Sequence, residues 1–295
     1  MGRDLIEIFG FSPKLLDSDV RKYWTLGACP FIKQKCIKFN HDQSIIYGTC
    51  SVSSPYGDII ICPNRLYANN YETIRKVSED AFGKTKFYSF AEFIDSKTST
   101  KDCVVALGIN SGKEVKIGKS LSMDWVLALV KNNKLLEYVG IEVQSIDITG
   151  NYRDAWHGYK NLKDPASVVP ASAHGLNWAN VHKRLIPQII RKGVVYSRSK
   201  YCKKGLYFVI PEIVYKKFED VIGSDIPTFK TPKNDTVSVF TYSLGQTLKG
   251  KPRNLDLTRV TRFSLDDFSN RFISGPNLPK PEELDSSIKR ILGVS

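Results

Sequence analysis

The stretch MDWVLALVKNNKLLEYVGIEVQSID, residues 123–147, contains the pattern that decides the fold. Two apolar runs flank the dipeptide Asn132-Asn133, which predicts two strands joined by a short turn. Asp124 stands at the head of the first run, and Glu142 and Gln144 stand at the end of the second. Because side chains alternate in direction along a strand, we expect Glu142 and Gln144 on one face of the sheet.

These polar side chains need an explanation, because a buried carboxylate is costly unless it is paired or binds a metal. One interpretation is a divalent-metal site with oxygen ligands from Asp124, Glu142 and Gln144. Glu114, at the start of the short predicted strand EVKIG, is a candidate fourth polar group there. The alternative for Glu142 and Gln144 is an amphipathic strand with a solvated face. The alternative for Glu114 is a solvated carboxylate in a turn.

Length and composition describe a globular chain. Its 295 residues predict one large domain or two modest ones, and 42% of them are hydrophobic. The apolar runs are far shorter than the roughly 20 residues that span a bilayer, so no membrane association is expected. The first residues, MGRDLIEIFGF, carry acids where a secretory signal would be basic and apolar. We therefore expect a cytoplasmic protein.

The net charge of +13 favours a polyanionic partner. Between Pro165 and Pro211 there is no acidic residue. Eight basic residues fall in this window: Lys183, Arg184, Arg191, Lys192, Arg198, Lys200, Lys203 and Lys204. Charge runs are usually solvated faces, but this distribution favours DNA or RNA phosphates as the partner. Lys183 and Arg184 are candidate DNA contacts.

Four of the six cysteines lie close together, at Cys29, Cys36, Cys50 and Cys62. In a cytosolic protein such a group indicates metal binding better than disulfides. Four thiolates would hold zinc or iron tetrahedrally in a structural site with no position open for substrate. The alternative is a set of buried free cysteines.

Asn64 and Arg65 closely follow the last of these cysteines. An amide and a guanidinium on a metal-stiffened loop are suited to reading adenine and guanine edges in a major groove. Capping of the loop by the same side chains is the alternative interpretation.

The rest of the chain alternates between helical and strand patterns, which predicts an α/β sheet with helices on its faces. Helices are expected over 69–82, ending at Gly83, and over the basic segment LNWANVHKRLIPQIIRKGVVYS, with a break at Pro187. The polar link SKTSTKD, residues 96–102, predicts a boundary between a cysteine-containing region, 1–100, and a core, 101–295.

Several motifs occur in an order that resembles the NotI-type restriction endonucleases. They are ACPF…C…GTC…CPNR, SMDW, VGIEVQSIDITGNYRDA and GLNWANVHKR. Each motif alone is weak, but the ordered set covers most of the chain. The resemblance implies a bacterial type II enzyme with the PD-(D/E)XK nuclease fold, acting as a homodimer on a GC-rich palindrome such as CGGCCG in double-stranded DNA and leaving a 5′ overhang.

The resemblance also implies roles for individual residues. Asp124 and Glu142 match the acids that bind Mg²⁺, and Glu114 matches an additional active-site acid. Gln144 stands where many relatives have lysine, and Lys113 and Lys119 are candidates to supply the missing charge. The four cysteines match a site that holds iron in the family, with zinc as the alternative metal.

Two other functions fit parts of this pattern. A non-enzymatic regulator built on the four-cysteine site would bind DNA without cutting it, but this leaves the acids of the hairpin unexplained. A repair nuclease or resolvase would cut DNA according to its shape rather than its sequence.

Overall fold

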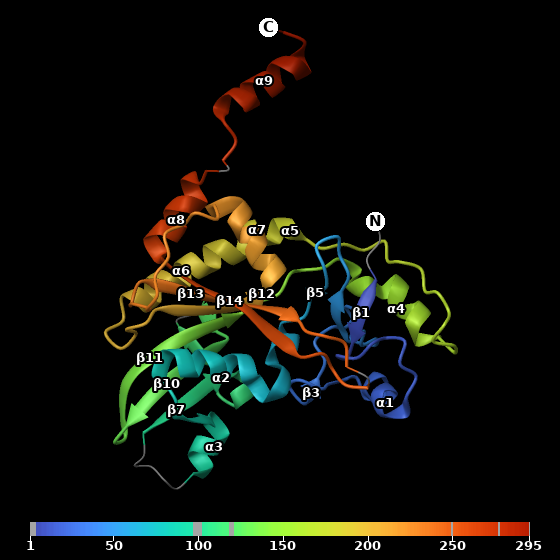
Figure 1. The fold of residues 1–295 in the computed structure, drawn as a ribbon, viewed down its shortest axis with the longest axis horizontal. Helices are drawn as coiled ribbons and strands as arrows, with labels where there is room; N and C mark the ends of the chain where they lie inside the picture. The colour runs from blue at the N-terminus through green and yellow to red at the C-terminus, as the bar shows by residue number, and fades with distance from the viewer. Residues whose placement is uncertain (1–3, 97–101, 118–120, 249, 277, 295) are drawn as a thin grey trace.

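The structure is a computed structural model that describes residues 4–96, 102–117, 121–248, 250–276 and 278–294. A mixed seven-stranded sheet forms its centre, helices cover both faces, and a lobe built largely from N-terminal residues packs at one side (Figure 1). The predicted class, an α/β sheet flanked by helices, is confirmed.

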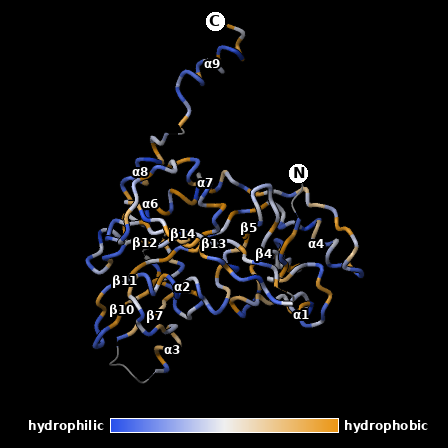
Figure 2. The backbone as a smooth tube through the Cα atoms, viewed as in Figure 1, coloured by the Kyte–Doolittle hydropathy of each residue, from blue (hydrophilic) through white to orange (hydrophobic). Residues whose placement is uncertain are grey.

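The central sheet combines parallel and antiparallel strands. Its order is β14 (Leu255–Ser264), β13 (Thr236–Leu244), β12 (Leu206–Pro211), β11 (Lys134–Val143), β10 (Trp125–Lys131), β7 (Cys103–Gly108) and β6 (Lys86–Ser89). Strands β11, β12 and β13 run parallel, and β10 and β14 pair antiparallel with their neighbours. All six residues of β12 are buried, as expected for a parallel strand covered on both faces, and this region is among the most apolar of the chain (Figure 2).

The predicted hairpin is present as β10 and β11, paired from Trp125 opposite Ile141 to Lys131 opposite Lys134. Asn132 and Asn133 connect the strands with φ values of 47° and 58°. Two left-handed residues are typical of the type I′ turn, whose twist matches that of the strands, and asparagine tolerates this conformation.

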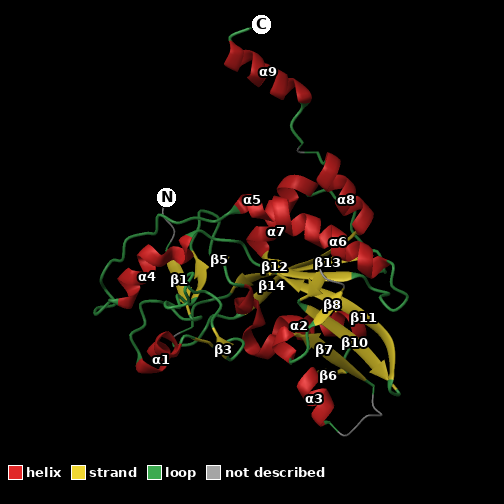
Figure 3. Cartoon of the chain, turned by 180° about the vertical axis from the view of Figure 1, so that it is seen from behind, coloured by secondary structure: helices red, strands yellow, loops and turns green. Residues whose placement is uncertain are grey.

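The two faces of the sheet are covered by different helices. Three helices lie on one face, seen at the top of Figure 3: α6 (Ile186–Ser197), α7 (Glu212–Ile222) and α8 (Leu265–Ser274). Helix α2 (Ala68–Phe82) lies on the other, where the Tyr207 hydroxyl of β12 donates to Asp80 at 2.9 Å. Gly140 of β11 faces α6, because a Cβ there would meet the Tyr196 ring at about 2.0 Å.

The basic segment folds as α5 (Trp178–Asn180), a π-helical turn (Val181–Leu185) and α6. The predicted break therefore appears as a widened turn just before Pro187, where the missing N–H prevents a regular helical hydrogen bond.

The lobe contains the antiparallel sheet β1 (Leu5–Ile8), β4 (Thr49–Val52) and β5 (Ile59–Ile60). The hairpin β2 (Ala28–Cys29) and β3 (Gln34–Lys35) lies beside it, together with helix α1 (Ser18–Leu26). Asp17 caps α1 by accepting from Asp19 N at 2.7 Å. Helix α4 (Arg153–Lys160) also belongs here, because Arg21 of α1 donates to the Tyr159 carbonyl at 3.3 Å.

Strand pairing and core packing cross the expected boundary at residue 100. Residues 97–101 of the predicted link lie outside the described residues, and β6 before them pairs parallel with β7 after them. Helix α4 from the second region packs on the first, and one hydrophobic core runs through both. Strands β1 and β14 were not expected from the sequence.

The remaining elements are short or peripheral. They are α3 (Phe90–Asp95), the hairpin β8 (Val115–Ile117) and β9 (Leu121–Met123), three 3-10 turns (Pro63–Tyr67, Ile109–Ser111 and Gly150–Tyr152), and α9 (Pro281–Leu292). None of the helices in the described part of the chain has the length and apolar character needed to cross a membrane.

Candidate functional site

The hairpin register brings two of the predicted acids together. Asp124 precedes β10 and stands one residue beyond the pair Trp125–Ile141, which places it across from Glu142 on β11. The Val143 N–H donates to Asp124 Oδ2 at 2.9 Å and fixes that carboxylate against the end of β11. The two acids therefore lie next to each other near the centre of the sheet.

A lysine that the sequence analysis did not single out for this site completes it. Lys192 of α6 is buried, and its ammonium forms an ion pair with Glu142 Oε2. The second oxygen, Glu142 Oε1, is also buried and has no hydrogen-bond partner among the described residues. Glu142 thus keeps one oxygen available for a further cation or donor.

Burial changes the acidity of both carboxyl groups. Loss of hydration and, to a smaller extent, the nearby Asp124 charge raise the pKa of Glu142 to about 7, and Lys192 opposes the rise. Burial also raises the pKa of Asp124, against the effects of the Val143 N–H and Lys192. Two carboxylates with one ammonium leave a surplus of negative charge that a divalent cation would neutralise.

Gln144 lies just past the end of β11, where its N–H donates to the Val209 carbonyl at 3.1 Å. It lines a small polar cavity of about 80 Å³ together with Arg184 and Gln188. Asp147 at the same cavity accepts from Asn180 Nδ2 at 2.8 Å. Gln144 therefore lies beside the basic helical segment, just past the end of the strand that carries Glu142.

Glu114 lies one residue before the pair Val115–Met123 of the β8–β9 hairpin, across from Asp124 in that register. Its carboxylate pairs with Lys116 at 3.2 Å. Lys113 is exposed, and Lys119 lies outside the described residues. The structure thus places Glu114 near the acids but does not connect it to them by a contact.

The donors at this site suit a hard divalent cation, because they are carboxylate and amide oxygens. The unpartnered Glu142 Oε1 is the observation that favours such a ligand. Among the residues that the structure describes, however, no three His, Cys, Asp or Glu side chains are grouped closely enough to hold one metal ion.

The four N-terminal cysteines are all buried and free. Cys29 ends β2, Cys36 follows β3, Cys50 lies in β4, and Cys62 precedes the 3-10 turn. Burial raises the pKa of each thiol, that of Cys36 to about 12. The charges of neighbouring cysteines add to this rise at Cys29, Cys36 and Cys50, so these thiols are close enough to interact.

Two of these cysteines sit in matching turns. Backbone N–H groups two and three residues ahead lower the pKa of Cys29 and of Cys62, against the larger effect of burial, and each cysteine is followed by a proline. Such N–H groups stabilise a thiolate. The donor set therefore fits a thiolate-bound metal chemically, although the sulfurs are not arranged at ligand spacing.

The structure corrects the hypothesis that Arg65 reads a base edge. Its side chain is fully buried, and its guanidinium donates to both oxygens of Glu7 at 2.8 Å and 3.0 Å. Asn64 is also buried, at 7% exposure. The guanidinium is committed inside the lobe, so it stabilises the loop and is not available to DNA.

The basic segment divides into two groups. Lys192 faces the acids, and Lys204 pairs with Glu137 at 3.0 Å. The other six are exposed: Lys183, Arg184, Arg191, Arg198, Lys200 and Lys203. The exposed group is free to contact an anionic partner, although Arg184 also lies 3.9 Å from Asp147.

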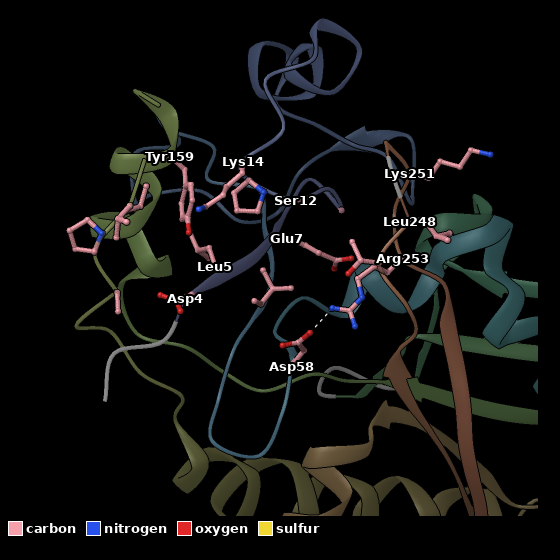
Figure 4. A pocket seen from close by; sticks show the side chains of 18 residues that line it. Asp4, Leu5, Glu7, Ser12, Lys14, Asp58, Tyr159, Leu248, Lys251 and Arg253 are labelled. Carbon is pink, nitrogen blue, oxygen red and sulfur yellow. Dashed lines mark hydrogen bonds and ion pairs between the residues drawn. The ribbon is translucent and has the colours of Figure 1, made fainter. Parts of the chain in front are cut away.

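A larger cavity, of about 670 Å³, lies in the N-terminal lobe, away from the acids. Figure 4 shows Asp58 and Arg253 pointing toward each other at its wall, joined by an ion pair. Glu7, also at the wall, is committed to Arg65. Three of its six charged lining residues, Glu7, Asp58 and Arg253, are held in ion pairs, so this cavity is a weaker candidate for chemistry than the acids of the sheet.

The sequence did contain an indication that Lys192 is buried beside a partner. In α6 the buried residues Ile186, Ile189, Gly193 and Tyr196 follow a helical period, and Lys192 falls within the same face. A lysine on the apolar face of an amphipathic helix requires a buried partner. No motif spacing identifies that partner, because Glu142 is 50 residues away.

Comparison with known proteins does not identify a family: no family model and no curated protein matches the chain.

Proposed function

We propose that the chain is a type II restriction endonuclease, which hydrolyses one phosphodiester bond in each strand of double-stranded DNA. The observation that carries this proposal is the group formed by Asp124 and Glu142 of the central sheet with Lys192 of α6, in which Glu142 and Lys192 are buried and Asp124 is partly buried. Two carboxylates with raised pKa values next to one ammonium are typical of catalytic sites that bind a divalent cation. The motifs that resemble the NotI-type enzymes, and a mixed sheet compatible with a PD-(D/E)XK core, support the same function.

Each residue has a proposed role. Asp124 and Glu142 would hold Mg²⁺ through their carboxylates, Gln144 would orient water or phosphate, and Glu114 would position the cation or a second one. When bound, Mg²⁺ would stabilise charge on the phosphate and lower the pKa of its water. Lys192 would supply from α6 the positive charge that Gln144 cannot supply from the strand.

The exposed basic residues would contact the DNA backbone. Lys183 and Arg184 lie in the π-helical turn directly before α6, which also carries Lys192. Phosphates bound by this turn would therefore be held at a fixed distance from the acids. By resemblance, the substrate is a GC-rich palindrome such as CGGCCG, cut with a 5′ overhang by a homodimer in the bacterial cytoplasm.

The four cysteines would bind iron, with zinc as the alternative, and the metal would hold the short strands of the lobe together. The matching N–H turns at Cys29 and Cys62 support this role. Metal analysis and a visible absorption band of the purified protein distinguish iron from zinc, and a metal-free protein would contradict both.

Plasmid digestion with Mg²⁺ tests the function. Discrete fragments with uniform ends are expected, and sequencing of the ends gives the recognition site. A smear would instead support a nuclease that reads DNA shape. Intact DNA together with tight sequence-specific binding would support a regulator.

Glu142→Ala tests the site. We expect it to abolish cleavage and leave specific DNA binding largely intact, because the carboxylate is placed in the chemistry and not on the DNA surface. Glu137→Gln, on the same strand and paired with Lys204, is the matched control and should still cut. Cleavage by Glu142→Ala at the wild-type rate would remove the assignment.

A further inference from the structure

Gly140 leaves a notch on the face of β11 that carries Glu142. Tyr138, Gly140 and Glu142 are two residues apart along this strand, so they project from the same face, toward α6. Because Gly140 has no side chain, it leaves a gap between the Tyr138 ring and the Glu142 carboxylate. Tyr196 of α6 fills this gap, because a Cβ on Gly140 would fall on the Cζ and the hydroxyl of its ring.

Tyr196 and Lys192 reach β11 side by side. They are four residues apart in α6 and both belong to its buried face. Four helical residues span about 6 Å and two strand residues span about 7 Å, so the spacing on α6 matches the spacing on β11. Lys192 therefore meets Glu142 while Tyr196 meets Gly140, with the helix and the strand running in opposite directions.

The Tyr196 ring acts through its shape and not through its charge. Its side chain is buried, at 2% exposure, and its ring contacts that of Tyr138, with the centroids 5.9 Å apart. Burial first, and then the charge of Glu142, raise the pKa of Tyr196 well above its usual value, so the phenol stays neutral. The ring end is therefore a neutral spacer between α6 and the backbone of β11.

We propose that Tyr196 is a positioning residue, whose ring rests on Gly140 and sets how closely α6 brings Lys192 to Glu142. The ring supports the helix one turn beyond Lys192. A shift of α6 away from β11 by about 1 Å would weaken the attraction between the ammonium and the carboxylate roughly tenfold. The packing role stands on these contacts alone, whereas its effect on cleavage rests on the proposed function.

Gly140→Ala tests the contact without changing a charge. Its methyl group would take the space of the ring end and push α6 outward, so Lys192 should become accessible more often. Amine labelling of the full chain without DNA, followed by mass spectrometry, should show Lys192 reacting roughly tenfold faster than in the wild type. Lys204, which is paired with Glu137, is the internal control and should react at its wild-type rate.

Tyr196→Leu removes the ring end and provides the second half of the test. In this background Gly140→Ala should no longer speed the labelling of Lys192, because the added methyl group meets no ring. Tyr196→Phe keeps the ring, so Gly140→Ala should act in that background as it does in the wild type. Gly158→Ala in α4 is the matched control: its Cβ would meet Val169 Cγ1 at 2.6 Å, and Lys192 should react as in the wild type.

Cleavage kinetics connect the contact to the reaction. Gly140→Ala should lower kcat about tenfold and leave KM nearly unchanged, because Lys192 is placed at the chemistry and not on the DNA surface. A normal kcat together with faster labelling would overturn the effect on cleavage. If the wild type does not cut DNA, the proposed function fails, and labelling still tests the positioning role.

Three labelling results would overturn the positioning role. The first is an unchanged rate at Lys192 in Gly140→Ala, as expected if the ring tilts into the cavity of about 260 Å³ that Tyr196 lines with Met123. The second is an equal effect of Gly140→Ala in the wild type and in Tyr196→Leu. The third is faster reaction of Lys204 as well, which would indicate a general loosening of the fold.

Discussion

Two glutamates in this protein are buried beside a basic side chain, yet their surroundings differ. Glu7 in the N-terminal lobe receives two hydrogen bonds from Arg65 and one from Ser51 at 3.0 Å, so both of its oxygens are bound. Glu142 on the central sheet is paired with Lys192 through one oxygen, and its other oxygen has no hydrogen-bond partner in the described part of the chain.

The difference separates a structural pair from a candidate reactive one. A carboxylate with all of its hydrogen-bonding capacity filled by protein is stabilised in its charged form and has nothing left for a ligand. A carboxylate that is buried but incompletely bound has a raised pKa and can take up a proton or a cation. The Glu7 pair therefore stabilises the lobe, and the Glu142 pair is available for function.

Breaking the pair between Glu7 and Arg65, in which both carboxylate oxygens are bound, should have the largest effect. Glu7→Gln leaves the Arg65 charge buried without compensation and should lower the free energy of unfolding by about 3–5 kcal/mol, as measured by urea denaturation. Asp225→Asn, at the exposed pair with Arg271, is the control and should change the free energy of unfolding much less. A loss at Glu7 no larger than at Asp225 would contradict the structural role.

Lys192→Met tests the pair between Glu142 and Lys192. If its ammonium takes the place of the lysine absent at position 144, cleavage should fall by about 10²–10³-fold, which corresponds to about 3–4 kcal/mol. Stability should change less than in Glu7→Gln, because Glu142 with its raised pKa can become protonated.

A second substitution distinguishes charge from packing. If Lys192 acts through its charge, adding Gln144→Lys to Lys192→Met should restore part of the cleavage rate. If Lys192 acts only through packing, a lysine at position 144 should not restore cleavage. Unchanged cleavage by Lys192→Met would show that its charge is not used.

The pH dependence of stability should be the smallest of these effects, about 3 kcal/mol in metal-free protein. Burial raises the pKa of Glu142 from 4.5 to about 7, so the folded state binds a proton over this range that the unfolded state has released. Its contribution to stability is therefore lost as the pH rises from about 4.5 to 7.

Urea denaturation of Glu142→Gln provides the comparison for this effect. The variant cannot ionise at position 142 and should show a flatter dependence than the wild type between pH 5 and 8, measured in the presence of a chelator. Equal slopes for the two proteins would mean that Glu142 ionises normally in the fold.

Local patterns in the sequence determined much of the fold. The apolar runs around Asn132-Asn133 predicted the hairpin, because asparagine suits the left-handed turn that joins twisted strands. The position of Gly83 predicted the end of α2, and Pro187 predicted the irregular turn before α6. Strand β14 was missed because its mixed polar pattern at the sheet edge is not that of a buried strand.

The pairing of distant groups was decided only by tertiary structure. Spacing indicated that Asp124 and Glu142 belong together, because both lie on one hairpin. It could not show that Lys192 reaches Glu142, or that Arg65 turns inward to Glu7 instead of outward to DNA. Short-range order follows from residue periodicity, whereas a buried charge takes whichever partner the packing of distant elements brings to it.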